Sequence, residues 1–234
     1  MLNHLIERLR GRARLSICSV GSGTGLFEIP MLARLSQTGI AMDRFVGIEP
    51  SEPACAVLES RLKAAAPPGL AYQIIAELFE TFETDERFDV VLLNHVVEYL
   101  PDDALRWIEK SIGLLEAGGS VLMFSPTRGG INRPYEVIRT ELTGKPPVFA
   151  EDMECILDEA AIAFAKETMI ATCDISALDR PGSEVEKLML LSFLTQRDCR
   201  GLPEGARERY VDYYRSLRPP GEPVIAHPTT LFVL

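Results

Sequence analysis

The chain has 234 residues, of which 47% are hydrophobic, 25% charged and 7% aromatic, and its formal net charge is −10. This composition excludes a disordered, collagen-like or disulfide-scaffold protein, and the acidic charge argues against a nucleic-acid partner, which needs a cationic surface. The five cysteines are scattered and form no CxxC pair, so we expect a reduced, cytoplasmic protein without a bound metal. No apolar run reaches membrane-spanning length and the first residues lack a signal-peptide pattern, so we expect no membrane association.

Short apolar runs alternate with longer amphipathic stretches over the first two-thirds of the chain. Short apolar runs predict strands, and stretches with helical periodicity predict helices. The expected strands cover residues 15–20, 43–48, 71–76, 89–93 and 121–124, and the expected helices cover residues 27–35, 52–66 and 102–115. Gly118 and Gly119 are expected to turn the chain into the last of these strands. Strands that alternate with helices predict a parallel sheet with helices on both faces.

The last third of the chain changes character. Residues 129–147 are rich in Gly, Pro and Arg and carry one short helical stretch. Beyond them we expect a helix at 152–165, a strand at 168–175, helices at 183–197 and 204–217, and a final strand at 230–234. Because the C-terminal run is so apolar, it is expected to join the sheet and not to form a frayed tail.

A glycine-rich loop follows the first expected strand and opens the first expected helix. Its glycines, Gly21, Gly23 and Gly25, have the spacing G-x-G-x-G, whereas a dinucleotide-binding loop has G-x-G-x-x-G. Gly21 permits a tight turn, and Gly23 lets a ligand approach the backbone. An open α/β sheet binds nucleotide-like ligands at this place, and G-x-G-x-G is typical of class I S-adenosylmethionine-dependent methyltransferases. A plain glycine turn is the alternative.

Polar residues end the next three expected strands. Glu49 lies 24 residues after the last loop glycine, where a carboxylate can accept both ribose hydroxyls of an adenosine; a solvated carboxylate is the alternative. Glu77 and Leu78 follow the third strand, where such enzymes enclose the adenine, although Glu77 could equally be a surface acid. Asn94 and His95 end the fourth strand, where the methyl group and the substrate nucleophile should meet.

Several longer segments are more specific than the glycine loop. They are Ser19 in front of that loop and residues 49–51 (EPS), 95–102 (HVVEYLPD), 172–176 (TCDIS), 191–195 (LSFLT) and 227–234. Together these segments resemble histamine N-methyltransferase. That family also has serine before the loop, residues 49–51 resemble its ribose-binding segment, and residues 95–102 resemble its substrate-contacting stretch.

The resemblance implies an α/β, Rossmann-like class I methyltransferase fold: a seven-stranded, mostly parallel sheet with helices on both faces and a small C-terminal substrate-binding elaboration. Residues 1–125 are then the S-adenosylmethionine-binding core, and residues 126–234 complete the sheet with substrate-binding insertions at 126–149 and 177–222. S-adenosylmethionine is the implied cofactor and S-adenosylhomocysteine its product, with no metal. The expected cofactor contacts are Gly21, Ser22, Gly23, Gly25, Glu49, Pro50, Glu77, Leu78 and Asn94.

The resemblance also places residues around the methyl acceptor. His95 stands where the family has a glutamine that hydrogen-bonds the substrate ring, His227 stands at an asparagine position, and Tyr135 replaces a pocket tryptophan. The expected acceptor-binding residues are His95, Glu98, Tyr99, Tyr135, Phe193 and His227, with His95 and Tyr99 catalytic. His95 and Tyr99 could orient the acceptor or take its proton, and Glu98 could balance a cationic acceptor. The alternatives are that His95 and His227 are structural histidines and that Phe193 belongs to the apolar core.

Two departures from the family bear on the acceptor. The first is that only 20 residues precede Gly21, whereas the family has a long N-terminal arm with a glutamate that holds the substrate amine. The second is that His95 and His227 replace two residues that contact the substrate in the family. We therefore expect a monomer or homodimer that methylates a nitrogen of a small metabolite: an imidazole, an amine or an amino-acid derivative. The alternatives are O-methylation of a carboxylate or phenol, N-methylation of a guanidine such as arginine, and a catalytically silent S-adenosylmethionine-binding interaction protein.

Overall fold

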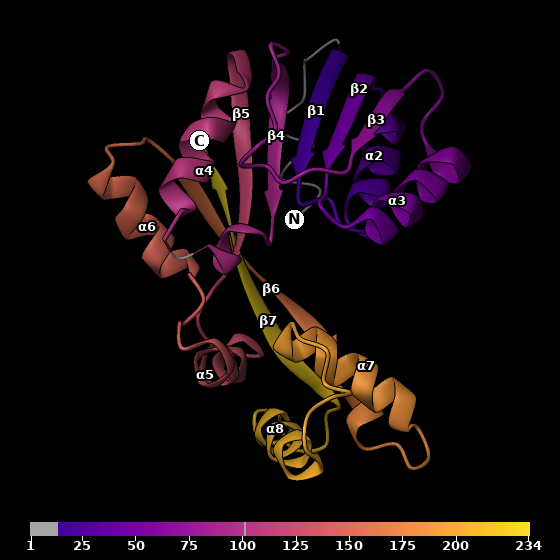
Figure 1. Ribbon diagram of the computed structural model, residues 1–234, viewed down its shortest axis with the longest axis vertical. Coiled ribbons are helices and arrows are strands. Elements are labelled where there is room, and N and C mark those ends of the chain that lie inside the picture. Colours follow the sequence, from indigo (N-terminus) through magenta and orange to yellow (C-terminus); the bar gives the residue numbers. More distant parts are fainter. Residues whose placement is uncertain (1–13, 101) are drawn as a thin grey trace.

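The computed structural model describes residues 14–100 and 102–234, and a seven-stranded sheet forms its centre. The strands are β1 (Arg14–Val20), β2 (Ala41–Ile48), β3 (Ala71–Ile75), β4 (Phe88–Asn94), β5 (Leu115–Pro126), β6 (Ala165–Asp174) and β7 (Val224–Val233). In the order β3-β2-β1-β4-β5-β7-β6, the first four pairs are parallel, and β7 is antiparallel to both of its neighbours (Figure 1). The predicted seven-stranded, mostly parallel sheet is therefore confirmed. Pro101, within the segment that resembles the substrate-contacting stretch, lies outside the described residues.

Helices cover both faces of this sheet, as the sequence predicts. The helices on the sheet are α2 (Glu28–Gln37) and α3 (Glu52–Ala65) on one face and α4 (Ala104–Gly113) and α6 (Ala150–Glu159) on the other. The remaining helices, α5 (Asn132–Thr143), α7 (Glu184–Thr195) and α8 (Glu204–Ser216), share a separate apolar cluster. Leu15 and Ile17 of β1 share an apolar cluster with α2 and α3, whereas Cys18 and Val20 share one with α4 and α6. β1 is therefore buried on both faces, which explains its continuous apolar run. Within the described residues, none of the helices has the length and hydropathy that a membrane span requires.

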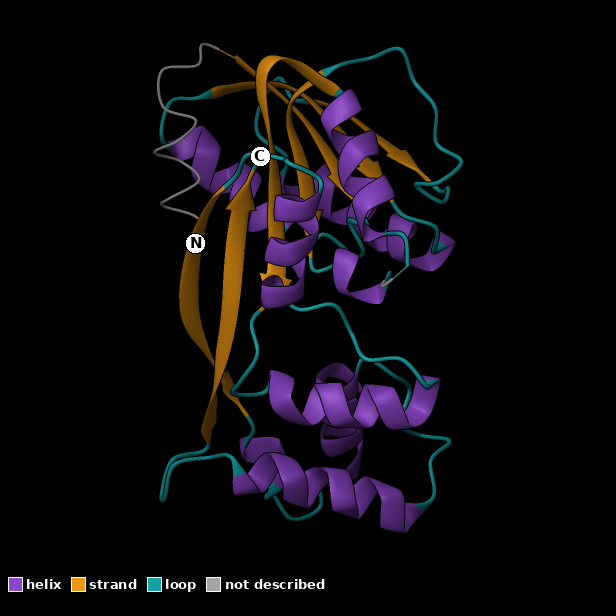
Figure 2. Ribbon diagram, turned by 90° about the vertical axis from the view of Figure 1, so that its left-hand side faces the viewer, coloured by secondary structure: helices purple, strands orange, loops and turns teal. Residues whose placement is uncertain are grey.

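A helical lobe surrounds the outer half of the antiparallel β6–β7 pair. The two long strands leave the sheet and reach α5, α7 and α8, which Figures 1 and 2 show as a separate layer beyond the carboxyl ends of the parallel strands. The lobe has its own apolar cluster, in which the hydroxyl of Tyr214 donates a 2.7 Å hydrogen bond to the carbonyl of Leu194. β7 belongs to both the sheet and the lobe, because its Phe232 packs in an apolar cluster of the sheet and its Ile225 packs in the cluster of the lobe. The division at residue 125 stays a prediction.

The glycine pair in front of the fifth strand differs from the prediction. Gly118 and Gly119 lie inside β5 and not in a turn before it. The pairing of β5 with β4 shifts register there, so the two glycines form a bulge. A Cβ on Gly119 would lie 3.0 Å from the carbonyl oxygen of Phe88, so the close approach of the two strands requires glycine.

Three elements of the last third also differ from the predictions. α5 is a full helix of 12 residues, where the sequence predicts only a short helical stretch. α6 ends at Glu159 and not near residue 165, because the chain reverses at Ala161, which has a left-handed backbone with φ of 53°. β7 begins at Val224 and not at residue 230, because its first half pairs with β6 outside the apolar centre of the sheet and needs no apolar run.

Candidate active site

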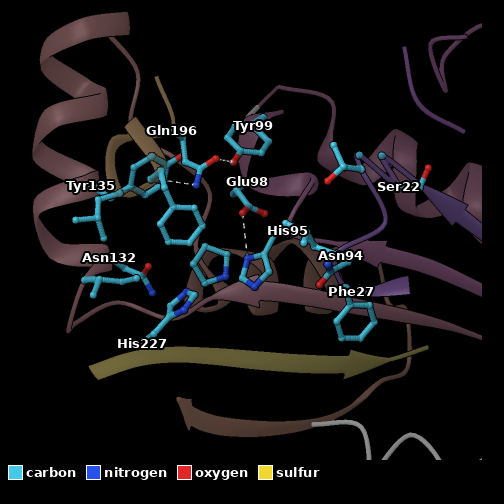
Figure 3. Close-up of a pocket in the computed structure, with 18 of the residues that line it drawn as sticks. Ser22, Phe27, Asn94, His95, Glu98, Tyr99, Asn132, Tyr135, Gln196 and His227 are labelled. Atoms are coloured by element: carbon cyan, nitrogen blue, oxygen red, sulfur yellow. Dashed lines mark hydrogen bonds and ion pairs between the residues drawn. The ribbon is translucent and has the colours of Figure 1, made fainter. Parts of the chain in front are cut away.

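A cavity of about 400 Å³ lies between the carboxyl ends of β1 and β4 and the helical lobe (Figure 3). It is lined by Gly21, Ser22, Gly23, Thr24, Leu26, Phe27, Glu28, Asn94, His95, Glu98, Tyr99, Pro126, Ile131, Asn132, Tyr135, Phe193, Leu194, Gln196 and His227. The structure thus brings together all six predicted acceptor residues and four of the predicted cofactor residues, namely Gly21, Ser22, Gly23 and Asn94. Cavities at this edge of an open α/β sheet are the usual ligand sites of the architecture.

The three glycines of the loop have different physical roles. Gly21 has φ of 63°, and a Cβ there would lie 2.2 Å from the Cγ1 of Val96, so no other residue fits. Gly23 has φ of 52° and no heavy atom within 4 Å of a Cβ position, so its backbone is open to a ligand. Gly25 does not line the cavity; a Cβ there would lie 2.4 Å from Leu58, so this glycine lets α2 approach α3.

Glu49 borders the glycine loop without lining the cavity. One of its carboxylate oxygens accepts the backbone N–H of Gly23 at 2.9 Å, and the other accepts the N–H of Ser51 at the same distance. Each oxygen keeps a second acceptor site, so a ribose hydroxyl can still bind. Pro50 is exposed beside it. The ribose contact itself stays a prediction.

The residues predicted to enclose an adenine lie outside the cavity. Glu77 and Leu78 follow the end of β3, and the side chain of Leu78 is 53% exposed. An exposed leucine beside a ligand-binding edge could still cover an aromatic ring, so the adenine contact stays a prediction. Asn94, by contrast, lies on the cavity wall at the end of β4.

Glu28 is a buried acid that the sequence reasoning missed. It begins α2, is 2% exposed and accepts a 2.9 Å hydrogen bond from the hydroxyl of Ser19. Burial raises the pKa of its carboxyl to about 7, while the bond from Ser19 acts in the opposite direction. The sequence shows a serine before the loop and an acid in the first helical turn, a pattern that does not by itself indicate burial.

His95 and Glu98 form a pair at the centre of the cavity. His95 has φ of 55°, a left-handed conformation that is uncommon for residues other than glycine, and its N–H donates to the carbonyl of Phe124 at 3.0 Å. Its Nδ1 lies 3.2 Å from Oε1 of Glu98, which is 4% exposed on the short helix η1 (Val97–Tyr99). The other oxygen of Glu98, Oε2, has no hydrogen-bond partner among the described residues.

His227 lies beside this pair on β7. The centroids of the His95 and His227 rings are 5.8 Å apart. Burial, with a smaller contribution from His95, lowers the pKa of His227 to about 4. His227 is therefore neutral at pH 7 and offers one donor and one acceptor nitrogen. Asn132 also lines the cavity, and its side-chain amide donates to the carbonyls of Thr127 and Pro228.

Tyr99 is held by a residue from the helical lobe. Its hydroxyl donates a 2.8 Å hydrogen bond to Oε1 of Gln196, and the amide of Gln196 donates to the carbonyl of Phe193 at 2.7 Å. Burial raises the pKa of the Tyr99 hydroxyl well above its usual value. This geometry favours a positioning role for Tyr99 over proton acceptance. Phe193 is 52% exposed, as expected for a side chain at the mouth of the cavity and not in the core.

Tyr135 and the charges of the lining complete the site. Tyr135 is 5% exposed, its hydroxyl has no hydrogen-bond partner within the described chain, and burial raises its pKa to about 12. The lining contains two acids, Glu28 and Glu98, and no lysine or arginine. The guanidinium of Arg139 lies behind this lining, 5.2 Å from the centroid of the Tyr99 ring, and donates to the Tyr99 carbonyl at 3.4 Å. Across residues 14–100 and 102–234, no cluster of three or more His, Cys, Asp or Glu side chains could hold a metal ion.

Sequence comparison supports a methyltransferase. Residues 18–121, which contain the glycine loop, Glu49 and the His95–Glu98 pair, match the model of a family described as a methyltransferase domain. No curated protein sequence matches the chain.

Solved structures share the fold at low sequence identity. The YcgJ protein of Bacillus subtilis superposes with a TM-score of 0.63 at 14% identity, with 99% of this chain and 96% of that chain covered. A SAM-dependent methyltransferase of Thiobacillus denitrificans in complex with S-adenosylhomocysteine gives 0.59 at 17% identity, covering 100% and 90%. Magnesium protoporphyrin IX methyltransferase of Synechocystis gives 0.53 at 15% identity, covering 73% and 74%. The chain therefore has the Rossmann-like class I methyltransferase fold, with a methyltransferase domain matched over residues 18–121.

Proposed function

We propose that this protein transfers the methyl group of S-adenosylmethionine to a nitrogen of a small metabolite. One observation carries the proposal: the open backbone of the G-x-G-x-G loop and the His95–Glu98 pair line the same cavity. The match to a methyltransferase domain supports the reaction class. Two structures of the same fold are complexes with S-adenosylhomocysteine, which supports the choice of cofactor.

The residues at the loop end of the cavity fit this cofactor. The hydroxyl of Ser22 is buried and has no hydrogen-bond partner among the described residues, so a ligand that reaches it completes its bonding. Gly23 leaves room for a ligand against its backbone. S-adenosylmethionine carries a sulfonium and an amino-acid ammonium group, and Glu28 places a titratable carboxyl on the wall of this end. In this proposal Glu49 binds the ribose hydroxyls of the cofactor, and Asn94 contacts the cofactor from the end of β4.

The chain contributes position and proton handling. S-adenosylmethionine supplies the methyl group when it is bound, and the sulfur keeps the electron pair of the broken C–S bond. Holding an acceptor in line with that bond can supply about 7–11 kcal/mol of the barrier. Neutral His227 and the Tyr99–Gln196 pair provide fixed hydrogen bonds for orientation. His95, at the end of β4, is the residue placed to take a proton from the acceptor.

The charges of the cavity favour a nitrogen acceptor over a carboxylate. A carboxylate would enter a lining that contains Glu28 and Glu98 and lacks lysine and arginine. Burying a negative charge without a cationic partner is strongly unfavourable, whereas a protonated or hydrogen-bond-donating nitrogen finds a partner in Glu98. The two histidines stand where histamine N-methyltransferase has a glutamine and an asparagine, so they depart from that family, and the resemblance stays a prediction. The proposed partner is a small molecule and not a nucleic acid or membrane.

The test is a screen with methyl-labelled S-adenosylmethionine. Imidazoles, alkyl amines, amino acids, guanidines, carboxylates and phenols are offered as acceptors, and labelled product and S-adenosylhomocysteine are both measured. The proposal predicts label on a nitrogen compound. Label only on carboxylates or phenols would contradict the nitrogen assignment, and calorimetric binding of NAD without binding of S-adenosylmethionine would contradict the whole proposal.

A further inference from the structure

Glu98 is a buried carboxylate whose only hydrogen-bond partner in the described chain is a histidine. Its side chain is 5% exposed, Oε1 lies 3.2 Å from Nδ1 of His95, and Oε2 has no partner. A buried carboxylate without a cation is unfavourable unless a partner or a ligand compensates it. Figure 3 shows the Glu98 side chain directed at the His95 ring, at the centre of the cavity.

The residues that line the cavity around this pair offer no other cation. Tyr99 on η1, Tyr135 on α5, His227 on β7 and Glu28 on α2 are the titratable groups that share the lining. The two tyrosines and His227 are uncharged near pH 7, because burial shifts each of their pKa values away from the charged form. Outside the lining, the guanidinium of Arg139 on α5 lies 5.2 Å from the centroid of the Tyr99 ring and donates to the Tyr99 carbonyl at 3.4 Å. Within the cavity, a positive charge beside Glu98 therefore comes from His95 or from the ligand.

The backbone at His95 holds the pair in place at a conformational cost. A left-handed φ of 55° is unfavourable for a residue with a Cβ, by about 1 kcal/mol or more, and survives where surrounding contacts fix it. Here the N–H of His95 is bonded to the carbonyl of Phe124. Such conformations cluster at functional sites, because they direct a side chain where an ordinary backbone would not.

We propose that Glu98 is a positioning residue that keeps the N–H of His95 on Nδ1, leaves Nε2 free as a proton acceptor, and selects acceptors that enter as ammonium ions. This proposal rests on the proposed function and names its substrate class: a small alkyl amine that is protonated in solution, and not an imidazole. An amine of pKa about 10.4 is neutral in only about one molecule in 2,500 at pH 7, so its methylation requires a base, whereas an imidazole is largely neutral already.

The proton and electron balance is simple. Nε2 of His95 takes one proton from the ammonium nitrogen, which regains its lone pair, and the imidazolium is stabilised by Glu98. The freed lone pair forms the new N–C bond as the C–S bond of the sulfonium breaks, and the bonding pair stays on sulfur. The methylated amine leaves as a cation, and His95 returns its proton to solvent. The second oxygen of Glu98 is available to another N–H of the bound ammonium ion.

The pair can be tested without any acceptor by NMR of protein labelled with nitrogen-15 histidine, in wild type and Glu98→Gln. The chain has three histidines, so His95 and His227 are readily assigned by substitution. We expect the wild-type His95 ring to carry its proton on Nδ1, and this preference to weaken in Glu98→Gln, which replaces the anionic acceptor by a neutral amide. The control is Glu136→Gln, which removes a half-buried acid of α5 that pairs with Arg128 and should leave the His95 tautomer unchanged. The same tautomer population in wild type and Glu98→Gln would overturn the pairing.

The substrate class is tested by calorimetry on protein saturated with S-adenosylhomocysteine. The probes are benzylammonium, benzoate and benzyl alcohol, which share a ring and differ in charge. We expect benzylammonium to bind best and Glu98→Gln to weaken it about tenfold or more, with Glu98→Asp recovering part of the loss. Stronger binding of benzoate, or no binding of benzylammonium, would overturn the class. Failure of S-adenosylhomocysteine itself to bind would instead contradict the proposed function, and the NMR result would still stand.

Discussion

The two ends of the cavity are built in different ways. The cofactor end is built around one short loop: Gly21 donates its N–H to the carbonyl of Ile48 at 2.8 Å, and Gly23 donates to the carboxylate of Glu49. The acceptor end is made of side chains that come from separate elements: His95 after β4, Tyr135 from α5, Gln196 after α7 and His227 from β7. A local motif therefore specifies the first end, whereas the second exists only after the helical lobe has folded against the sheet.

The difference between the two ends has a functional consequence. A backbone loop suits a ligand that is constant, and a set of unconnected side chains can change to suit a different acceptor. Substitutions at one end should therefore affect one ligand and spare the other. The predictions below test this separation, beginning with the largest expected effect.

His95→Ala should affect the acceptor end alone. Loss of a general base lowers kcat/KM by about 10²–10⁴. The affinity for S-adenosylmethionine, measured by calorimetry, should hardly change. The acid limb of the wild-type pH–rate profile should also be lost in the mutant, unless that limb belongs to the substrate. Near-wild-type kcat/KM would show that His95 is only structural.

Glu49→Ala should affect the cofactor end alone. Loss of a charge-assisted hydrogen bond to a ribose costs about 1.5–3 kcal/mol, which is about a 10- to 150-fold weaker affinity for S-adenosylmethionine. Calorimetry measures the loss, and the exposed neighbouring acid Glu52 supplies the control variant Glu52→Ala, which should bind as wild type. Equal affinities in all three proteins would remove Glu49 from the cofactor site.

His227→Asn should change how stability depends on pH. The pKa of His227 is lowered from 6.5 to about 4, so between these values the unfolded chain binds a proton that the folded protein does not. The wild type therefore loses stability as pH falls through this window. At 1.36 kcal/mol per pKa unit, the loss in the free energy of unfolding would be about 3 kcal/mol for a fully buried ring. Because the His227 ring is partly exposed, we expect a loss of about 1–2 kcal/mol.

Urea unfolding at pH 6.5 and pH 4 measures this effect in wild type and in His227→Asn. The mutant should lose less stability between the two values. The raised pKa of Glu28 acts in the opposite direction in both proteins, because its folded form holds a proton that the unfolded chain releases as pH rises, and it therefore cancels in the comparison. Identical pH dependence in the two proteins would show that His227 is not buried in its neutral form.

Phe193→Ala should give the smallest effect. Its ring is half exposed at the cavity mouth, so its removal should raise the KM for the acceptor only about two- to fivefold and leave cofactor affinity unchanged. Met189→Ala is the matched control, because Met189 is exposed on the same helix and does not line this cavity. Equal KM values in the two variants would place Phe193 outside the acceptor site.

Local sequence patterns predicted the sheet and the cofactor end well. Apolar runs flanked by glycine, proline or acids identified β1 to β4 to within two residues. The signal is clearest for β1 and β4, which are buried on both faces, whereas β3 at the edge of the sheet is only partly buried. The bulge at Gly118 and the first half of β7 were not predicted, since both depend on the partner strand and not on local apolar character.

Apart from His95, which was predicted from its place at the end of the fourth strand, the acceptor end could be predicted only through the family resemblance. Gln196 was missed because its role depends on a left-handed backbone, with φ of 52°, at the end of α7, and on the packing of the lobe that brings it to Tyr99. Glu28 was missed because an acid in the first turn of a helix usually faces solvent. Neither burial nor the bond to Ser19 is encoded in a spacing.

A crystal structure of the complex with S-adenosylhomocysteine tests the central claim most directly, because that claim is the arrangement of two ends in one cavity. We expect the ribose hydroxyls within about 3 Å of the Glu49 carboxylate, the amino-acid portion near Ser22 and Glu28, and the sulfur facing His95. A ligand bound away from the glycine loop, or one whose sulfur faces away from His95 and Glu98, would contradict the account.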